Sequence, residues 1–252
     1  MLDRDEPTPG AVPSPAGSMP HTSGAARATR SAIRIWILAL TVGLIAGVTS
    51  WAIGEATNVP ERGRMAMKGE NLPPPSVNGT HNAIFSYGAL GAALGLAMGL
   101  AGGLIGQSFF RAGLASLSGL CLGGGAGVIT ARLTAPFFYE HVTADDLTYS
   151  LIVHSVIWAT VGGVAGFAFA CGIGGRGRLV NATVGGVVGA LLATVIYEFA
   201  GGILAPFAAT NLPVSLTWQS RLAARLLVAV LVSSGIVLSA RSSAERDGVE
   251  TT

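Results

Sequence analysis

The chain is poor in charged side chains: only 11% of its 252 residues are Asp, Glu, Lys or Arg. A soluble domain of this size carries about 25% charged residues to cover its surface. The formal net charge of +2 also leaves no large basic patch. With 50% hydrophobic residues and a mean hydropathy of +0.59, the composition argues against a soluble enzyme, a disordered protein and a nucleic-acid-binding protein. It predicts an all-α, polytopic integral membrane protein.

Cysteine and catalytic motifs are equally scarce. Cys121 and Cys171 lie in apolar runs with no CxxC pair and no histidine nearby, which predicts two small buried hydrophobic residues rather than a disulfide or a metal site. The HExxH, GxSxG, GxSG and P-loop motifs are absent. We therefore expect no enzyme activity, no catalytic residues and no cofactor.

What the chain has instead is six apolar runs long enough to cross a hydrocarbon core about 30 Å thick. We place these transmembrane helices at Ile35–Ile53, Ile84–Gly106, Ala112–Thr130, Ser150–Cys171, Leu179–Phe199 and Leu222–Ala240. A bilayer is thus the first expected partner, with a homo-oligomer or another membrane protein as possible further ones.

The segments around these runs complete the predicted organisation. Residues 1–30, rich in Pro, Ser, Gly and Ala, form a disordered tail, because they bury too little apolar surface to fold. Residues 31–54 form a signal-anchor-like first helix, and whether it is removed stays open, since Ser50-Trp51-Ala52 loosely fits a cleavage site. The rest divides into an outer loop (55–82), a first hairpin with its outer loop (83–148), a second hairpin with an apolar outer loop (149–220), a sixth helix (221–241) and a cytoplasmic tail (242–252).

Charges in the short loops predict the orientation. Basic residues precede the first run, connect the second to the third and the fourth to the fifth, and follow the sixth (Arg27, Arg30, Arg34, Arg111, Arg176, Arg178, Arg241 and Arg246). All of them fall on one side if six spans alternate, and cytoplasmic loops are the ones enriched in arginine. We expect both termini in the cytoplasm and the protein in the cell (plasma or inner) membrane.

Glycines recur at four-residue spacing in the middle runs. The helix-packing candidates are Gly91, Gly95, Gly99, Gly103, Gly119, Gly123, Gly127, Gly162, Gly166, Gly185, Gly186 and Gly189. Residues four apart lie on one helix face, so each series leaves a groove without side chains where two backbones can approach. This glycine-zipper pattern predicts that the four middle helices form a tight central bundle, with the first and sixth helices outside it.

The same pattern indicates an internal repeat. A shift of 67 residues superposes Gly95 on Gly162, Arg111 on Arg178 and Gly119 on Gly186, while the tripeptide Ala-Pro-Phe recurs at 135–137 and 205–207. Two Gly- and Ala-rich stretches also align by chance more easily than ordinary sequence. We nevertheless predict two repeated hairpins with the same orientation, related by an axis along the membrane normal.

Polar residues gather near the predicted outer face. Glu140, His141, Asp145, Asp146 and His154 form a weak candidate cluster for a divalent cation. Because a solvated loop is polar anyway and either aspartate can cap the fourth helix, we predict no metal site.

Two charged residues fall within the membrane. Glu198 and Arg225 should lie near the same membrane face, where we expect them to form an ion pair or to share a water-filled vestibule. The apolar segment from Ala200 to Ser220, between the fifth and sixth runs, lies on the membrane surface or dips partway into it as a re-entrant element shielded by protein.

Two function classes remain. The first is a non-enzymatic membrane component, such as a scaffold, accessory subunit or regulator, packed through the glycine faces. The second is a small permease or channel for a neutral or small solute, built from two parallel helical hairpins. A continuous polar path between the hairpins would favour the second, and a dry glycine-packed interface the first.

Overall fold

The computed structural model describes residues 22–59, 75–141, 147–204 and 209–249. Its elements are the helices α1 (Thr22–Thr57), α2 (Pro75–Ile105), α3 (Phe109–His141), α4 (Leu147–Ile173), α5 (Arg176–Leu204) and α6 (Trp218–Val249). Each contains a stretch long and apolar enough to cross a membrane, so the six predicted spans are confirmed. A chain with six such helices is an integral membrane protein in contact with the bilayer.

Several helices are longer than their apolar runs. α1 begins at Thr22, ahead of the apolar run from which it was predicted. Alanine and arginine are strong helix formers, and an established helix extends through them at little cost. α6 likewise continues to Val249, into the predicted 242–252 tail. At the start of α2, Pro75 occupies a first helical position, where proline is favoured.

The third helix is also longer than the predicted one. α3 continues to His141, so the first Ala-Pro-Phe tripeptide lies within the helix rather than in a loop. The second copy, at 205–207, falls outside the described residues. Hydropathy locates where a helix is apolar, but helix ends depend on local capping and packing, which the apolar pattern does not report.

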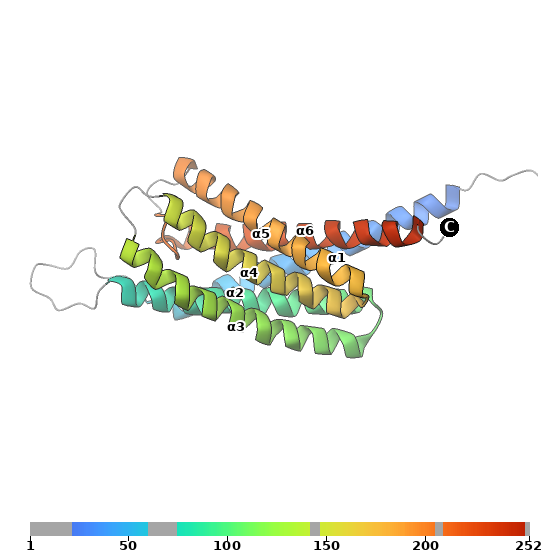
Figure 1. Cartoon of the computed structure of the whole chain (residues 1–252), viewed down its shortest axis with the longest axis horizontal. Helices are drawn as coiled ribbons and strands as arrows, with labels where there is room; N and C mark the ends of the chain where they lie inside the picture. Colours follow the sequence, from blue (N-terminus) through green and yellow to red (C-terminus); the bar gives the residue numbers. More distant parts are fainter. Residues whose placement is uncertain (1–21, 60–74, 142–146, 205–208, 250–252) are drawn as a thin grey trace, which may run out of the picture.

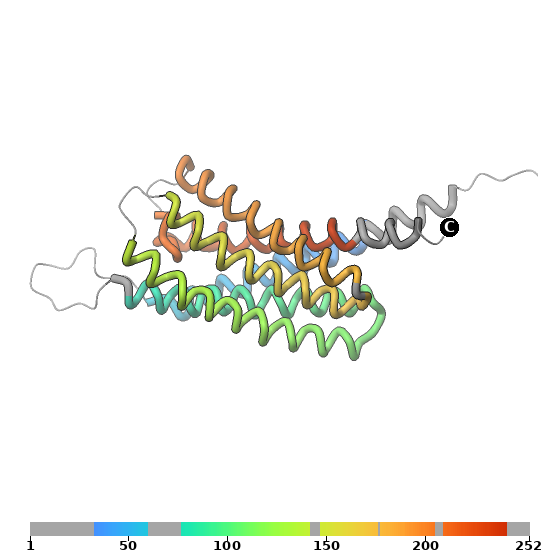
Figure 2. Tube along the Cα trace, in the orientation of Figure 1, coloured from blue at the N-terminus to red at the C-terminus, as the bar shows by residue number. Residues whose placement is uncertain are grey.

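The helices run along one common long axis (Figure 2). α1 begins and α6 ends at the same end of the bundle, which also holds the α2–α3 and α4–α5 connections (Figure 1). We call it the tail end, and we call the opposite end, where the segment between α5 and α6 lies, the loop end. Each helix packs on the next along the chain, α1 also packs on α6, and α2 packs on α4.

The centre of the bundle holds two helices rather than the four predicted from glycine. In the most apolar window of α2 and of α4, 61% of the residues are buried, whereas α3 and α1 each reach only 28%. We call the glycines that recur at four-residue spacing the ladder glycines, and those of α3 all lie on its buried face. The opposite face of α3 exposes large apolar residues, among them Leu114, Leu117, Leu122, Ile129 and Leu133. In a bilayer such a face costs nothing, because lipid is as apolar as leucine.

Glycine brings α2 and α3 together backbone to backbone. A Cβ atom at Gly91 would overlap the carbonyl group of Gly123, and one at Gly123 would overlap that of Gly91. Gly95 and Gly119 meet in the same reciprocal way. The contact continues with Gly99 against the Ala115 carbonyl, Gly103 against Ala112, and Gly127 against the Tyr87 carbonyl.

The second hairpin and its neighbour pack in the same manner. Gly162 of α4 and Gly186 of α5 each lie against the other's carbonyl group, and Gly166 lies against that of Ala182. α5 then meets α6 through Gly185 and Gly235, again reciprocally, while Gly189 abuts the Leu231 carbonyl.

Glycine also shapes the connection between α4 and α5. Gly174 and Gly175 have φ angles of 83° and 105°, a conformation that side chains with a Cβ disfavour. The guanidinium of Arg111, at the start of α3, donates to the Ile173 carbonyl oxygen over 3.2 Å and caps the end of α4. This cap ties the two hairpins together at the tail end.

Candidate functional site

A buried polar pair lies at the loop end, between α4 and α5. His154 Nδ1 contacts Glu198 Oε1, and the side chains are 2% and 0% exposed. Ser150, one turn before His154 on the same face of α4, donates its hydroxyl proton to the same Oε1 over 2.6 Å. The other carboxylate oxygen, Oε2, is buried without a hydrogen-bond partner. We call His154 and Glu198 the dyad.

The segment between α5 and α6 packs against this dyad. Residues 209–217, which we call the Pro213 loop, are not helical, yet Thr210, Leu212 and Ser215 are buried. The Pro213 carbonyl oxygen accepts a hydrogen bond from Tyr87 Oη and lies 3.3 Å from His154 Nε2. The loop therefore packs among the helix ends, where protein covers part of its backbone.

Arg225 of α6 is the third buried ionisable side chain, with 5% exposure. It donates to the hydroxyl of Ser86, and its guanidinium carbon lies 4.7 Å from the centre of the Tyr87 ring, a cation–π arrangement. The expected ion pair with Glu198 is not formed, because Glu198 bonds instead to Ser150 and His154. Tyr87 contacts Arg225 with its ring and the Pro213 loop with its hydroxyl.

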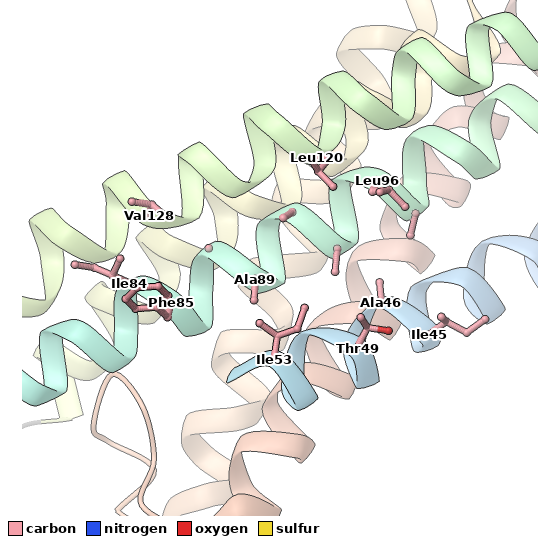
Figure 3. A pocket seen from close by; sticks show the side chains of 14 residues that line it. Ile45, Ala46, Thr49, Ile53, Ile84, Phe85, Ala89, Leu96, Leu120 and Val128 are labelled. Atoms are coloured by element: carbon pink, nitrogen blue, oxygen red, sulfur yellow. The ribbon is translucent and has the colours of Figure 1, made fainter. Parts of the chain in front are cut away.

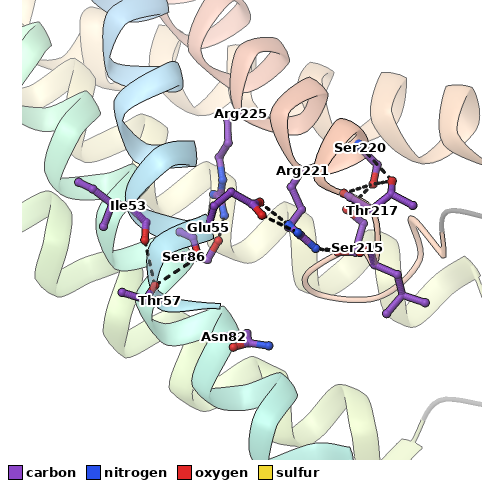
Figure 4. Close-up of polar contacts among 12 residues, drawn as sticks. Ile53, Glu55, Thr57, Asn82, Ser86, Ser215, Thr217, Ser220, Arg221 and Arg225 are labelled. Atoms are coloured by element: carbon purple, nitrogen blue, oxygen red, sulfur yellow. Dashed lines mark hydrogen bonds and ion pairs between the residues drawn. The ribbon is translucent and has the colours of Figure 1, made fainter. Parts of the chain in front are cut away.

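A second, more accessible ion pair fixes the start of α6. Arg221 Nε and Nη2 donate to the two carboxylate oxygens of Glu55 at the end of α1, over 2.5 and 2.7 Å. Its Nη1 donates to the carbonyl oxygens of Ser215 and Leu216 over 2.8 and 2.9 Å (Figure 4). One guanidinium therefore joins α1, α6 and the Pro213 loop.

Two hollows adjoin the Pro213 loop. A cavity of about 10 Å³, close to the smallest that admits one water, is lined by residues including Tyr87, His154, Tyr197 and Arg225. A wider recess of about 260 Å³ is lined by Asn58, Val59, Asn82, Val214, Ser215, Leu216 and Arg221. Both share Val214, Ser215 and Arg221, so the loop separates the recess from the dyad.

The weak cation candidates do not converge. Glu140 and His141 are exposed at the end of α3, whereas His154 is buried against Glu198. Asp145 and Asp146 lie outside the described residues. Within the described ranges no group of three or more His, Cys, Asp or Glu side chains comes close enough to hold a metal ion. The His141 ring packs instead on Phe137 and Tyr149.

The cysteines differ from their prediction as well. Both are free, but Cys121 is exposed and Cys171 is only half-buried. In a chain surrounded by lipid, an apolar run can face outward as readily as inward, which hydropathy alone does not distinguish.

The chain matches no family model, no curated protein and no solved structure.

A larger opening lies on the side of the bundle, over α2 and between α1 and α3. It has a volume of about 490 Å³ and an apolar lining that includes Ile45, Ile53, Phe85, Ala89, Leu96 and Val128 (Figure 3). Small residues on α2 leave this space, because Gly88, Ala89, Ala92 and Ala93 project little into it. With a nearly wholly apolar lining, the opening offers hydrophobic contact and no reactive group.

Sequence reasoning singled out Glu198, Arg225 and His154, but it associated Glu198 with Arg225, whereas the ion pair of Glu198 in the structure is with His154. It did not single out Tyr87, Pro213 or the bond between Glu55 and Arg221. The one available signal was the i, i+4 spacing of Ser150 and His154, which places two polar side chains on one face of an apolar helix. On a buried helix such a face requires polar partners from elsewhere.

Proposed function

We propose that this six-helix protein is a non-enzymatic membrane component, such as a scaffold, accessory subunit or regulator. The observation that supports it is the packing between helices, where glycine meets carbonyl oxygen in α2–α3, α4–α5 and α5–α6. Such contacts leave no space for water or a solute. Most of the side chains enclosed between the helices are apolar, among them Leu90, Leu94, Met98, Ile157 and Val161, and the buried hydroxyl groups of Thr194 and Ser233 are polar exceptions away from the loop end.

We further propose that these faces are glycine zippers and that the two hairpins are copies of one ancestral hairpin. Two sets of contacts support this. Gly95 meets Gly119 in the first hairpin, and the residues 67 positions later, Gly162 and Gly186, meet in the second. Gly99 against Ala115 is matched in the same register by Gly166 against Ala182. Chance alignment of glycine-rich sequence would not by itself make equivalent residues touch.

Transport assays test the proposed function. We expect proteoliposomes containing the purified protein to pass water, glycerol and protons no faster than protein-free liposomes of the same lipid. Stopped-flow light scattering measures the first two, and an enclosed pH-sensitive dye measures the third. A flux that scales with the amount of protein would contradict the packed, non-transporting body.

One observation favours the alternative of a small permease. Glu198, His154 and Arg225 are buried together at the loop end beside a cavity of about 10 Å³. Ionisable residues within a membrane protein commonly line substrate or proton pathways. Only a polar path that continues from this cavity to the tail end would make the protein a transporter. The flux assay decides between the non-transporting component and the permease.

A further inference from the structure

We infer that the dyad is a proton-binding site and that its bound proton holds the Pro213 loop in place. The inference concerns His154, Glu198, Pro213 and Tyr87, and it does not depend on whether the protein is a scaffold or a permease. It rests on which atoms face each other at the two nitrogens of one imidazole ring.

The nearest oxygen atom at each ring nitrogen of His154 accepts hydrogen bonds, and the Ser150 hydroxyl, which lies 3.4 Å from Nδ1, already donates to Glu198. Nδ1 faces Glu198 Oε1, which already accepts the hydroxyl proton of Ser150. Nε2 faces the Pro213 carbonyl oxygen, which has no proton to give. A neutral imidazole carries one N–H and therefore satisfies only one of these contacts from its own protons.

The geometry thus calls for two protons along the line from Glu198 through the ring to Pro213. One lies between Nδ1 and Oε1, and the other lies on Nε2. They are present either as imidazolium with carboxylate or as neutral imidazole with a carboxylic acid. In both descriptions the dyad carries no net charge, which suits a pair whose side chains are 2% and 0% exposed.

Loss of one proton to water leaves a carboxylate and a neutral ring with a single N–H. That N–H stays on Nδ1, because a hydrogen bond to a carboxylate is stronger than one to a carbonyl group. Nε2 then presents a lone pair to the Pro213 carbonyl oxygen, and the contact turns from attraction to repulsion. Tyr87 alone then continues to donate to the Pro213 carbonyl oxygen, while Arg221 still donates to those of Ser215 and Leu216. The cavity of about 10 Å³ lies beside the His154 ring, and its size is close to that of the one water that could accept the proton.

The charged and titratable groups around the dyad come from several elements. α2 contributes Tyr87, α5 contributes Tyr197, and α6 contributes Arg225 and Arg221, all of which line the cavity with His154. Arg221 is paired with Glu55 of α1. On α3, Glu140 and His141 are exposed and lie outside this cavity lining. Arg225 remains the positive charge nearest the Tyr87 ring in either state of the dyad.

Hydrogen exchange with mass spectrometry tests the proposal on the full chain in lipid nanodiscs. The readout is the exchange rate of peptides covering residues 209–217 at a series of pH values between about 5 and 9, a series that brackets the interval in which an ordinary histidine side chain changes charge. The comparison variant is Glu198→Gln, whose amide donates to Nδ1 and keeps the single ring proton on Nε2. Because the loop sequence is unchanged, the ratio of wild-type to variant rates cancels the intrinsic effect of pH on exchange.

We expect this ratio to stay near one at low pH and to rise about three- to tenfold at high pH, as for one lost hydrogen bond. Glu140→Gln, which neutralises an exposed carboxylate on α3, should follow the wild type at every pH. A ratio that is constant over the range would overturn the proposal. If Glu198→Gln does not fold, the turn at residues 106–108 of the wild type serves as the reference. A ratio of loop exchange to turn exchange that stays constant over the pH range then overturns the proposal equally.

Discussion

Three ionisable side chains at the loop end divide into two separate partnerships. His154 and Glu198 bond to each other, while Arg225 bonds to Ser86 and lies over the Tyr87 ring. Removing one member of a buried polar pair leaves the other without a partner, which costs more than replacing both. The thermodynamic coupling between residues should therefore follow these partnerships rather than the formal signs of charge.

A double-mutant cycle measures this coupling. We expect Glu198→Gln and His154→Phe to be non-additive by about 0.5–3 kcal/mol in unfolding free energy, the range for residues in direct contact. Glu198→Gln combined with Arg225→Met should be additive within about 0.5 kcal/mol. Denaturant unfolding in micelles gives both values. Stronger coupling to Arg225 than to His154 would restore the ion pair that sequence alone suggested.

Tyr87 has two functions that one substitution separates. Tyr87→Phe keeps the ring beneath Arg225 but removes the hydroxyl bond to Pro213, so we expect a loss of about 0.5–1.5 kcal/mol. The lost stability should appear as faster hydrogen exchange in residues 209–217. Tyr149→Phe is the matched control, because that ring packs on Phe137 and His141 instead. Equal exchange in both variants would argue against the Pro213 contact.

At the scale of the helices, the four-residue spacing of glycine was the most informative feature of the sequence. It indicated which faces of α2, α3, α4 and α5 carry no side chains, and the ladder glycines meet backbone from a neighbouring helix. The spacing did not indicate that α3 lies at the edge, nor that Gly235 of α6 faces Gly185. A groove on one helix does not specify its partner, since every neighbouring backbone fits it equally well.

Leucine at a crossing point, by which we mean a position where the backbones of two helices touch, should disrupt the bundle. We expect Gly95→Leu and Gly186→Leu each to lower the yield of folded protein and to destabilise it by at least about 1–3 kcal/mol, because the obstructing atoms belong to backbone. Thermal unfolding monitored by circular dichroism in micelles measures the effect.

Gly125→Leu and Gly202→Leu are matched controls in α3 and α5, because, apart from the neighbouring residues and local backbone of the same helix, no atom of the described residues lies within 4 Å of a Cβ at either position. Their stability should remain close to that of the wild type. If the crossing-point and control variants are equally stable, the close backbone contacts do not stabilise the bundle.

At the scale of the whole molecule, its two ends differ. The loop end holds the dyad, Arg225 and the bond between Glu55 and Arg221, while the tail end holds short turns capped by Gly174 and Arg111. Sequence predicted that polar residues would gather at one end. It could not predict their partners, because His154 and Glu198 are 44 positions apart and Tyr87 and Pro213 are 126 positions apart.

Reporter fusions test the proposed orientation in the membrane. Arg178 follows the α4–α5 turn at the tail end, whereas Thr210 belongs to the Pro213 loop at the loop end (Figure 1). We expect a fusion after Arg178 to report the cytoplasm and one after Thr210 to report the opposite side, with a fusion after Thr252 matching Arg178. Finding Arg178 and Thr210 on one side would contradict a six-span arrangement.

The reciprocal contacts of Gly91 with Gly123 and of Gly162 with Gly186 have an evolutionary consequence. Outward-facing apolar residues can exchange freely over time, since acyl chains tolerate any of them. The crossing points allow no such drift, because even a methyl group meets main-chain atoms there. Homologous proteins should therefore keep these glycines after most other positions have diverged. The paired glycines form a sequence pattern by which distant homologues can be recognised.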